Sequence, residues 1–239
     1  MSIVRYICAA TAILLPLGAV AVEAQYDIVT SSRAMAARDT LENTLRNQNW
    51  NNQDSADEMY TNEQLNRMIE DRLLYSIVRD RDKCQFTPDI EDRARLVGIP
   101  VFMYAWGDML LSGVCVKADS ELGLEYLEKA AENAYAPALE RLSFYYEKGY
   151  LVGRDLDKSE RYMHTAAVLG SKTGRLGWAD MLVRGFGTPA LYEEAFSWLY
   201  HSTYNDPYDR FKQQYLQEEL EKRMPPNVVA RDIAYGFDY

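Results

Sequence analysis

A spacing of 36 residues recurs in the middle of the chain and constrains its fold more than any other feature. A repeat of this length is typical of a helical solenoid, in which each unit is a helix pair that buries its apolar face only against a neighbouring pair. The sequence therefore predicts three stacked units over residues 100–204. The landmarks that return at this interval are Gly113, Gly149 and Gly185; Tyr126, Tyr162 and Trp198; Ala130–Ala131 and Ala166–Ala167; and Asp119 and Asp155.

Each unit also carries the signals that begin and end its two helices. A glycine such as Gly113 follows the first helix and can adopt the left-handed conformation that ends it. An aspartate such as Asp119 then lies where its side chain can cap the second helix. Small residues in both helices, such as Gly107 and Ala130, are predicted to let the helices approach closely.

These units resemble the Sel1-like repeat, a relative of the tetratricopeptide repeat with a longer loop between its helices. The third unit departs from the signature because Ser202 and Thr203 replace the alanine pair, as expected of the end of an array. The resemblance implies an all-α, right-handed helical solenoid that acts as a binding scaffold. The matching positions are Gly107, Gly113, Tyr126, Ala130 and Ala131; then Gly149, Tyr162, Ala166 and Ala167; and then Gly185 and Trp198.

Four segments flank the repeats. Residues 1–24 have the positive charge, apolar run and small terminal residue of a signal peptide, and the run is too short for the alternative of an uncleaved membrane anchor. Residues 25–60 are polar and predicted to be flexible. Amphipathic spacing predicts an N-terminal helical cap over residues 61–99, and a C-terminal helical cap with an aromatic tail over residues 205–239.

Two apolar stripes support these caps. Thr61 is predicted to begin a helix that continues to about Asp80, because a capping box is followed by apolar residues at helical spacing. A second helix is predicted to begin after Asp206. The first stripe comprises Leu65, Ile69, Leu73 and Ile77, and the second comprises Tyr208, Phe211, Tyr215 and Leu220.

The cysteines and the charge restrict the chemistry further. Cys84 and Cys115 remain after removal of the signal peptide, and in an oxidising compartment we expect them to form a disulfide between the cap and the first repeat. The competing interpretations are a catalytic thiol or a metal site, but the sequence has no CxxC or HExxH pattern. The net charge of −10 disfavours nucleic acid and anionic membrane surfaces as partners. We predict no cofactor and no metal.

Aromatic residues are the candidates for protein binding. Tyr145 and Tyr146 are adjacent in a predicted helix, so we expect one of them to point away from the core. His164, by contrast, is predicted to be a packed or surface residue rather than a catalytic one. We expect no enzyme activity, although the many carboxylates leave glycan cleavage open. The full set of candidate partner-binding residues is Trp50, Tyr145, Tyr146, Tyr150, Phe237 and Tyr239.

Several segments outside the general signature resemble one branch of Sel1-repeat proteins, which are periplasmic components of sodium-driven polar flagellar motors. These segments are DKCQF around Cys84, GVCV around Cys115, YEEAFSWLYHS and KRMPPNVVAR. The resemblance implies a scaffold in the T ring of the basal body that binds MotY and the stator B subunit and helps recruit or retain stator units. The alternatives are an adaptor of another envelope or signalling complex and, third, a repeat-bearing cell-wall enzyme.

Overall fold

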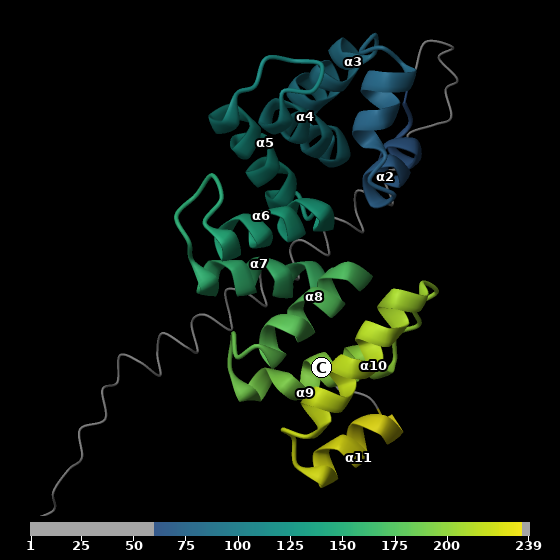
Figure 1. Cartoon of the computed structure of the whole chain (residues 1–239), viewed down its shortest axis with the longest axis vertical. Helices are drawn as coiled ribbons and strands as arrows, with labels where there is room; N and C mark the ends of the chain where they lie inside the picture. Colours follow the sequence, from purple (N-terminus) through teal and green to yellow (C-terminus); the bar gives the residue numbers. More distant parts are fainter. Residues whose placement is uncertain (1–59, 236–239) are drawn as a thin grey trace, which may run out of the picture.

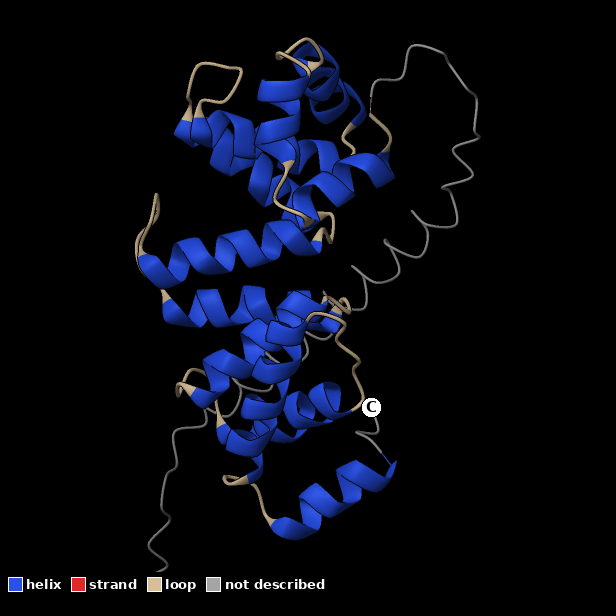
Figure 2. Cartoon of the chain, turned by 45° about the vertical axis from the view of Figure 1, so that its right-hand side comes forward, coloured by secondary structure: helices blue, strands red, loops and turns tan. Residues whose placement is uncertain are grey.

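The computed structural model describes residues 60–235, and every regular element within this range is a helix (Figures 1 and 2). The helices stack along the long axis of the molecule, with α2 near one end and α11 at the other (Figure 1). The elements are α2 (Asn62–Glu70), the π-helix η1 (Ser76–Arg81), α3 (Thr87–Asp92), the π-helix η2 (Arg93–Val97), α4 (Pro100–Ser112), α5 (Ser120–Glu132), α6 (Ala136–Lys148), α7 (Leu156–Val168), α8 (Lys172–Val183), the 3₁₀-helix η3 (Pro189–Leu191), α9 (Tyr192–Tyr200), α10 (Pro207–Glu221) and α11 (Pro226–Tyr235).

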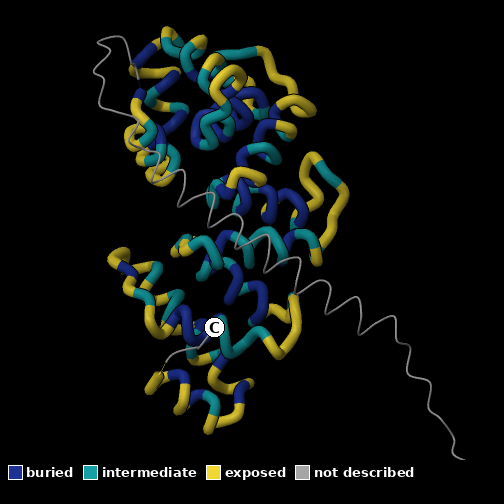
Figure 3. Tube along the Cα trace, turned by 180° about the vertical axis from the view of Figure 1, so that it is seen from behind, coloured by how far each residue is buried: buried dark blue, intermediate teal, exposed yellow. Residues whose placement is uncertain are grey.

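Three helix pairs form the repeats, namely α4–α5, α6–α7 and α8–α9, and the prediction of an all-α solenoid is confirmed. The alanine pair of each complete repeat is buried in the second helix, and Ala130, Ala166 and Ala167 are fully inaccessible. Buried positions continue through the middle of the stack, whereas the exposed positions gather on loops and on the outer helices (Figure 3).

The loops between paired helices have the same backbone conformation in successive repeats. Gly113 and Gly149 follow α4 and α6 with φ values of 70° and 68°, so each ends its helix in the left-handed region, as predicted. A second left-handed residue follows two positions later at Cys115, Leu151 and Gly187. Cys115 and Leu151 show that the loop imposes this conformation even on residues with a side chain.

The two predicted caps of the second helices are also present. The Asp119 side chain accepts a hydrogen bond from the Leu122 N–H at 3.0 Å, and that of Asp155 accepts one from the Lys158 N–H at 2.8 Å. The backbone N–H of each aspartate also donates to a carbonyl of the preceding helix. Each aspartate therefore begins the second helix and holds it beside the first.

A contact between small residues sets the close approach of the helices within each pair. A Cβ atom on Gly107 of α4 would lie 2.8 Å from the carbonyl oxygen of Gly123 in α5, so a side chain there would clash with backbone. In the next pair, Ser143 donates its hydroxyl to the Ser159 carbonyl at 2.8 Å. These positions recur 36 residues later at Ala179 and Ala195, which are both buried. Gly123 and Ser159 of the second helices were not identified from the sequence as contact residues.

The N-terminal cap differs from its prediction in one important respect. The helix that begins at Thr61 ends at Glu70, because Arg72 adopts a left-handed conformation with φ of 59°. The interruption shifts the apolar register, so that Leu74 is buried while the predicted core residue Leu73 is 45% exposed. The prediction of an unbroken helix to about Asp80 was therefore wrong.

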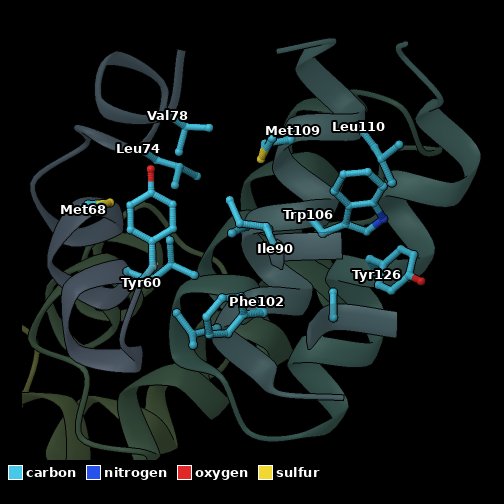
Figure 4. Close-up of a cluster of buried hydrophobic side chains, with 14 residues drawn as sticks. Tyr60, Met68, Leu74, Val78, Ile90, Phe102, Trp106, Met109, Leu110 and Tyr126 are labelled. Atoms are coloured by element: carbon cyan, nitrogen blue, oxygen red, sulfur yellow. The ribbon is translucent and has the colours of Figure 1, made fainter. Parts of the chain in front are cut away.

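Tyr60 is part of the folded cap rather than of the polar segment before it. Its side chain is buried in the cluster that contains Val78 of η1 and Ile90 of α3 (Figure 4). Its hydroxyl donates to the Asp82 carboxylate. Its ring contacts Phe86 edge to face, with the ring centres 5.5 Å apart. The boundary predicted after residue 60 thus lies at or before this residue.

A disulfide joins the cap to the first repeat, as predicted. Cys84 and Cys115 are bonded, with their Cα atoms 5.4 Å apart, and Cys115 lies in the loop between α4 and α5. Both cysteines have a left-handed backbone with φ of 63°. The covalent link therefore fastens the loop of the first repeat to the turn before α3.

The C-terminal cap buries only part of the predicted stripe. Asp206 caps α10 as expected, and α10 buries Leu220 of that stripe together with Leu216, which was not predicted. Tyr208 and Phe211 are 72% and 71% exposed. Their face of α10 points away from α8 and α9, the neighbours against which the helix packs. The predicted signal peptide, nearly all of the predicted flexible segment and the aromatic end of the tail lie outside the described residues.

Candidate functional site

A groove of about 930 Å³ lies where the N-terminal cap meets the first helices of the repeats. The first helices α4 and α6 and the start of α8 form its walls together with the end of α2 and the segment between α2 and η1, whereas the second helices contribute no lining residue. The groove therefore opens on the first-helix face of the solenoid. Its lining residues are Ile69, Glu70, Arg72, Leu74, Tyr75, Tyr104, Asp108, Ala136, Pro137, Glu140, Arg141, Phe144, Leu169, Gly170, Ser171, Lys172 and Thr173.

A polar network across two repeats forms one wall. Arg141 of α6 donates from Nη2 to the Tyr104 hydroxyl of α4 at 3.0 Å. The same nitrogen lies 3.5 Å from Oδ1 of Asp108, which is 8% exposed. Tyr75 of the cap donates its hydroxyl to the Asp108 carbonyl, and burial raises the pKa of that hydroxyl above its usual range. The network therefore joins the cap, the first repeat and the second repeat.

Glu140, the residue before Arg141 in α6, faces the start of α8. It accepts a hydrogen bond from the Ser171 hydroxyl at 2.5 Å, and Ser171 is itself the N-cap of α8. Burial raises the pKa of the Glu140 carboxyl above its usual range, the Ser171 and Gly174 hydrogen bonds oppose the rise, and the Glu70 carboxylate adds to it. Glu140 and Glu70 therefore create a locally negative end of the groove.

The structure corrects the prediction for the adjacent tyrosines. Tyr145 and Tyr146 are 4% and 8% exposed, so neither lies on an open binding face. Tyr145 packs in the cluster that contains Tyr104, while Tyr146 stacks on Tyr162 of α7 with the ring centres 5.7 Å apart. A helix inside a solenoid is covered by neighbours on two sides, and adjacent residues can therefore both be buried. Burial raises the pKa of Tyr145 to about 12.

Exposed aromatic residues do occur beside this pair. Phe144 lines the groove and is 48% exposed, and Tyr150 in the following loop is 56% exposed. Tyr145 lies between them, with ring centres 6.0 Å from Phe144 and 5.4 Å from Tyr150. Tyr150 thus remains a candidate contact, whereas Phe144 was missed because its large apolar side chain resembles a core residue in sequence. Trp50, Phe237 and Tyr239 lie outside the described residues.

His164 is packed among aromatic rings, as its sequence context predicted. Its ring stacks on Trp178 with the ring centres 4.2 Å apart, and its Nε2 atom lies 3.5 Å from the Glu194 carboxylate. The Trp178 Nε1–H donates to the buried Glu160 at 2.6 Å. Within residues 60–235, no group of three or more His, Cys, Asp or Glu side chains is placed to hold a metal ion.

Comparison with known proteins identifies both the repeats and a relative that matches most of the chain. The family model for the Sel1 repeat matches residues 100–135, 136–171 and 175–200. The sodium-type polar flagellar protein MotX of Vibrio parahaemolyticus serotype O3:K6 (strain RIMD 2210633) is 40% identical over 173 residues, which are 72% of this chain and 82% of the relative. A crystal structure of a Sel1 repeat protein from Oxalobacter formigenes is 19% identical, with a TM-score of 0.45, and the match covers 54% of this chain and 97% of that one.

None of the helices described here has the length and apolar character needed to cross a membrane.

Proposed function

The chain belongs to the family of the sodium-type polar flagellar protein MotX, and we propose that it serves such a motor as a non-enzymatic scaffold for other proteins. The observation that carries the proposal is the 40% identity over most of both chains. That match is longer than the three repeats, so it extends beyond them.

We place this scaffold in the periplasm, as part of the T ring of the basal body. The signal-peptide pattern of residues 1–24 supports export, and the Cys84–Cys115 disulfide suits an oxidising compartment. In this proposal the scaffold binds MotY and the stator B subunit, and it helps recruit or retain the sodium-driven stator units.

A scaffold role agrees with how the polar groups of the groove are used. Arg141, Asp108 and Tyr104 bind one another across two repeats, and Glu140 binds the N-cap of α8. These contacts hold the walls of a surface in place. Stacked helix pairs of this kind create extended concave surfaces suited to binding other proteins.

Deletion of the gene tests the proposal most directly. We expect cells that still carry polar flagella by electron microscopy but do not swim in sodium medium, with motility restored by the wild-type gene. Basal bodies purified from the complemented cells should contain the chain, and mass spectrometry should find MotY with it.

Two results would contradict the proposal. Normal swimming after deletion would separate the chain from the motor. Release of muropeptides from purified cell wall by the isolated protein, abolished by an acid-to-amide substitution, would instead indicate an enzyme.

A further inference from the structure

We infer that the groove between the N-terminal cap and the first two repeats binds an extended segment of a partner protein, with a basic side chain of that segment held at Glu70 and Glu140. The inference rests on the proposed function, because it assigns the partner contact of the scaffold to one face. The partner chemistry follows from the charges and the aromatic residue that line the groove.

The position of the groove favours an extended chain as its occupant. Its lining comes from the end of α2 and the segment after it, from α4 and α6, and from the start of α8. The occupant therefore contacts the cap, the first two repeats and the start of the third at once. A helix end or a compact loop would contact fewer of them.

The charges at one end of the groove favour a cation. Neither Glu70 nor Glu140 forms an ion pair with any residue from 60 to 235. Asp108, by contrast, already faces Arg141 within the groove. An ammonium or guanidinium group of a partner supplies the missing positive charge, and charge-assisted hydrogen bonds to carboxylates are among the stronger polar contacts in proteins.

The cations that line the groove do not fill this role. Arg141 is engaged by Tyr104 and Asp108. The Lys172 ammonium donates to the Thr203 carbonyl at 2.7 Å, so it lies against the loop before α10. Arg72 is exposed beyond the end of α2 and has no carboxylate of residues 60–235 within ion-pair distance.

Glu140 is not needed as a carboxylate for folding. Burial is the main cause that raises the pKa of Glu140 in the folded chain. Protonated Glu140 therefore stabilises the folded state at low pH, and this stabilisation is lost as the pH rises through the raised pKa. A neutral Gln at this position can still accept the Ser171 hydrogen bond. The substitution Glu140→Gln is therefore expected to leave stability unchanged or raised, which makes it a clean test of binding.

Phe144 supplies the apolar part of the contact. It lines the groove on α6, one residue before Tyr145, and about half of it remains exposed. Lys and Arg side chains bury their alkyl stems on such surfaces while their charged ends reach a carboxylate. An aromatic face also attracts a nearby cation.

Peptide titration of the purified chain, residues 25–239 with its disulfide intact, tests the assignment. The probes are acetyl-Gly-Phe-Lys-Gly-Lys-Gly-amide and two analogues in which Glu or Gln replaces both lysines. We expect only the lysine peptide to shift the amide NMR signals of residues lining the groove, such as Ser171 and Phe144. Shifts with the glutamate peptide instead, shifts away from the groove, or none with any peptide would overturn the inference.

Matched variants identify the residues responsible. Glu70→Gln with Glu140→Gln should weaken binding of the lysine peptide by about tenfold or more, as loss of charge-assisted hydrogen bonds implies. Phe144→Ala should weaken it by a smaller factor. Glu121→Gln with Glu132→Gln removes the same charge from exposed positions of α5 and should leave binding unchanged. If the two double variants weaken binding equally, peptide binding depends on net charge rather than on the groove, and the inference is overturned.

The same variants in cells separate this inference from the proposed function. If wild-type chain is recovered with basal bodies but the Glu70→Gln and Glu140→Gln variant is retained equally well and supports swimming, the groove assignment fails alone. If the wild-type chain is absent from basal bodies, the proposed function fails. Peptide binding that requires removal of residues 25–59, or self-association that Glu140→Gln abolishes, would also overturn the assignment to a partner.

Discussion

The first two repeats and the N-terminal cap differ in how their conformation is determined. In the repeats, the same left-handed glycine, aspartate cap and small-residue contact return after 36 residues. In the cap, two π-helices and three left-handed residues that are not glycine, at Arg72, Lys83 and Cys84, occur within about 30 residues.

The difference shows which part of the chain depends on local sequence and which on distant contacts. A left-handed conformation is costly for a residue with a side chain and persists where the surrounding structure holds it. The cap has such support in its disulfide to Cys115 and in the buried contact between Tyr60 and Asp82. We therefore expect the cap to depend on these links, and the repeats to depend on packing within and between helix pairs.

Removal of the disulfide should have the largest effect. On the chain-entropy model, replacing Cys84 and Cys115 by serine costs about 3 to 4 kcal/mol for a loop of this length. Urea unfolding should show the loss, and hydrogen exchange should show it concentrated in α2, α3 and α4. Equal loss of protection in α7 and α8, or a melting curve unchanged by reducing agent, would contradict the proposed division.

Enlarging the alanine pair should perturb the repeats instead. Ala130 and Ala167 are completely buried, so replacement of either by leucine is expected to overpack the contact at a cost of about 1 to 3 kcal/mol. Ala230→Leu, at an exposed position of α11, serves as the control for added apolar area. If the buried variants unfold at the same urea concentration as the control, the repeat packing described above is wrong.

Removal of a helix cap should have a smaller and nearly equal effect in both repeats. Asp119→Ala and Asp155→Ala each remove one hydrogen bond at the start of a second helix, at a cost of about 1 kcal/mol. Thermal unfolding of the two single variants measures this cost. A large difference between the two costs would indicate that the repeats are less alike in stability than in geometry.

The smallest expected effect depends on pH and concerns the ion pair between α6 and α8. The Arg184 guanidinium, 2.9 Å from the Glu147 carboxylate, is the main cause that lowers the pKa of Glu147 to about 2. The contribution of this ion pair to the free energy of unfolding is therefore complete above the ordinary glutamate pKa, and it is lost as the pH falls through about 2. Arg184→Ala should cost about 0.5 to 1 kcal/mol at pH 7 and progressively less as the pH falls toward 2, as measured by urea unfolding. Arg95→Ala, in the cap, removes an exposed ion pair with Asp92, three residues earlier in the chain, and should cost less.

Apart from the Cys84–Cys115 disulfide, the sequence predicted mainly features that repeat and missed contacts between non-equivalent positions. Gly113 and Asp119 could be identified because the same residue types return in the next unit. The break at Arg72 could not, since nothing in an arginine predicts a left-handed backbone. The Arg141–Asp108 contact joins residues 33 apart, which does not match the period, so the groove was not predicted. The burial of both Tyr145 and Tyr146 could have been foreseen, because helices inside a stack have neighbours on two sides.

The way the repeats are joined also determines how the molecule responds to force. Between successive helix pairs of the described chain, the contacts are made by side chains, as in the Glu147–Arg184 pair, and no strand ladder crosses the junctions. Bending of the stack therefore shifts side chains past one another while the hydrogen bonds inside each helix stay intact. Near α2 the covalent bridge opposes such movement. We therefore expect the molecule to be stiffest at its disulfide-linked end and more elastic toward α11.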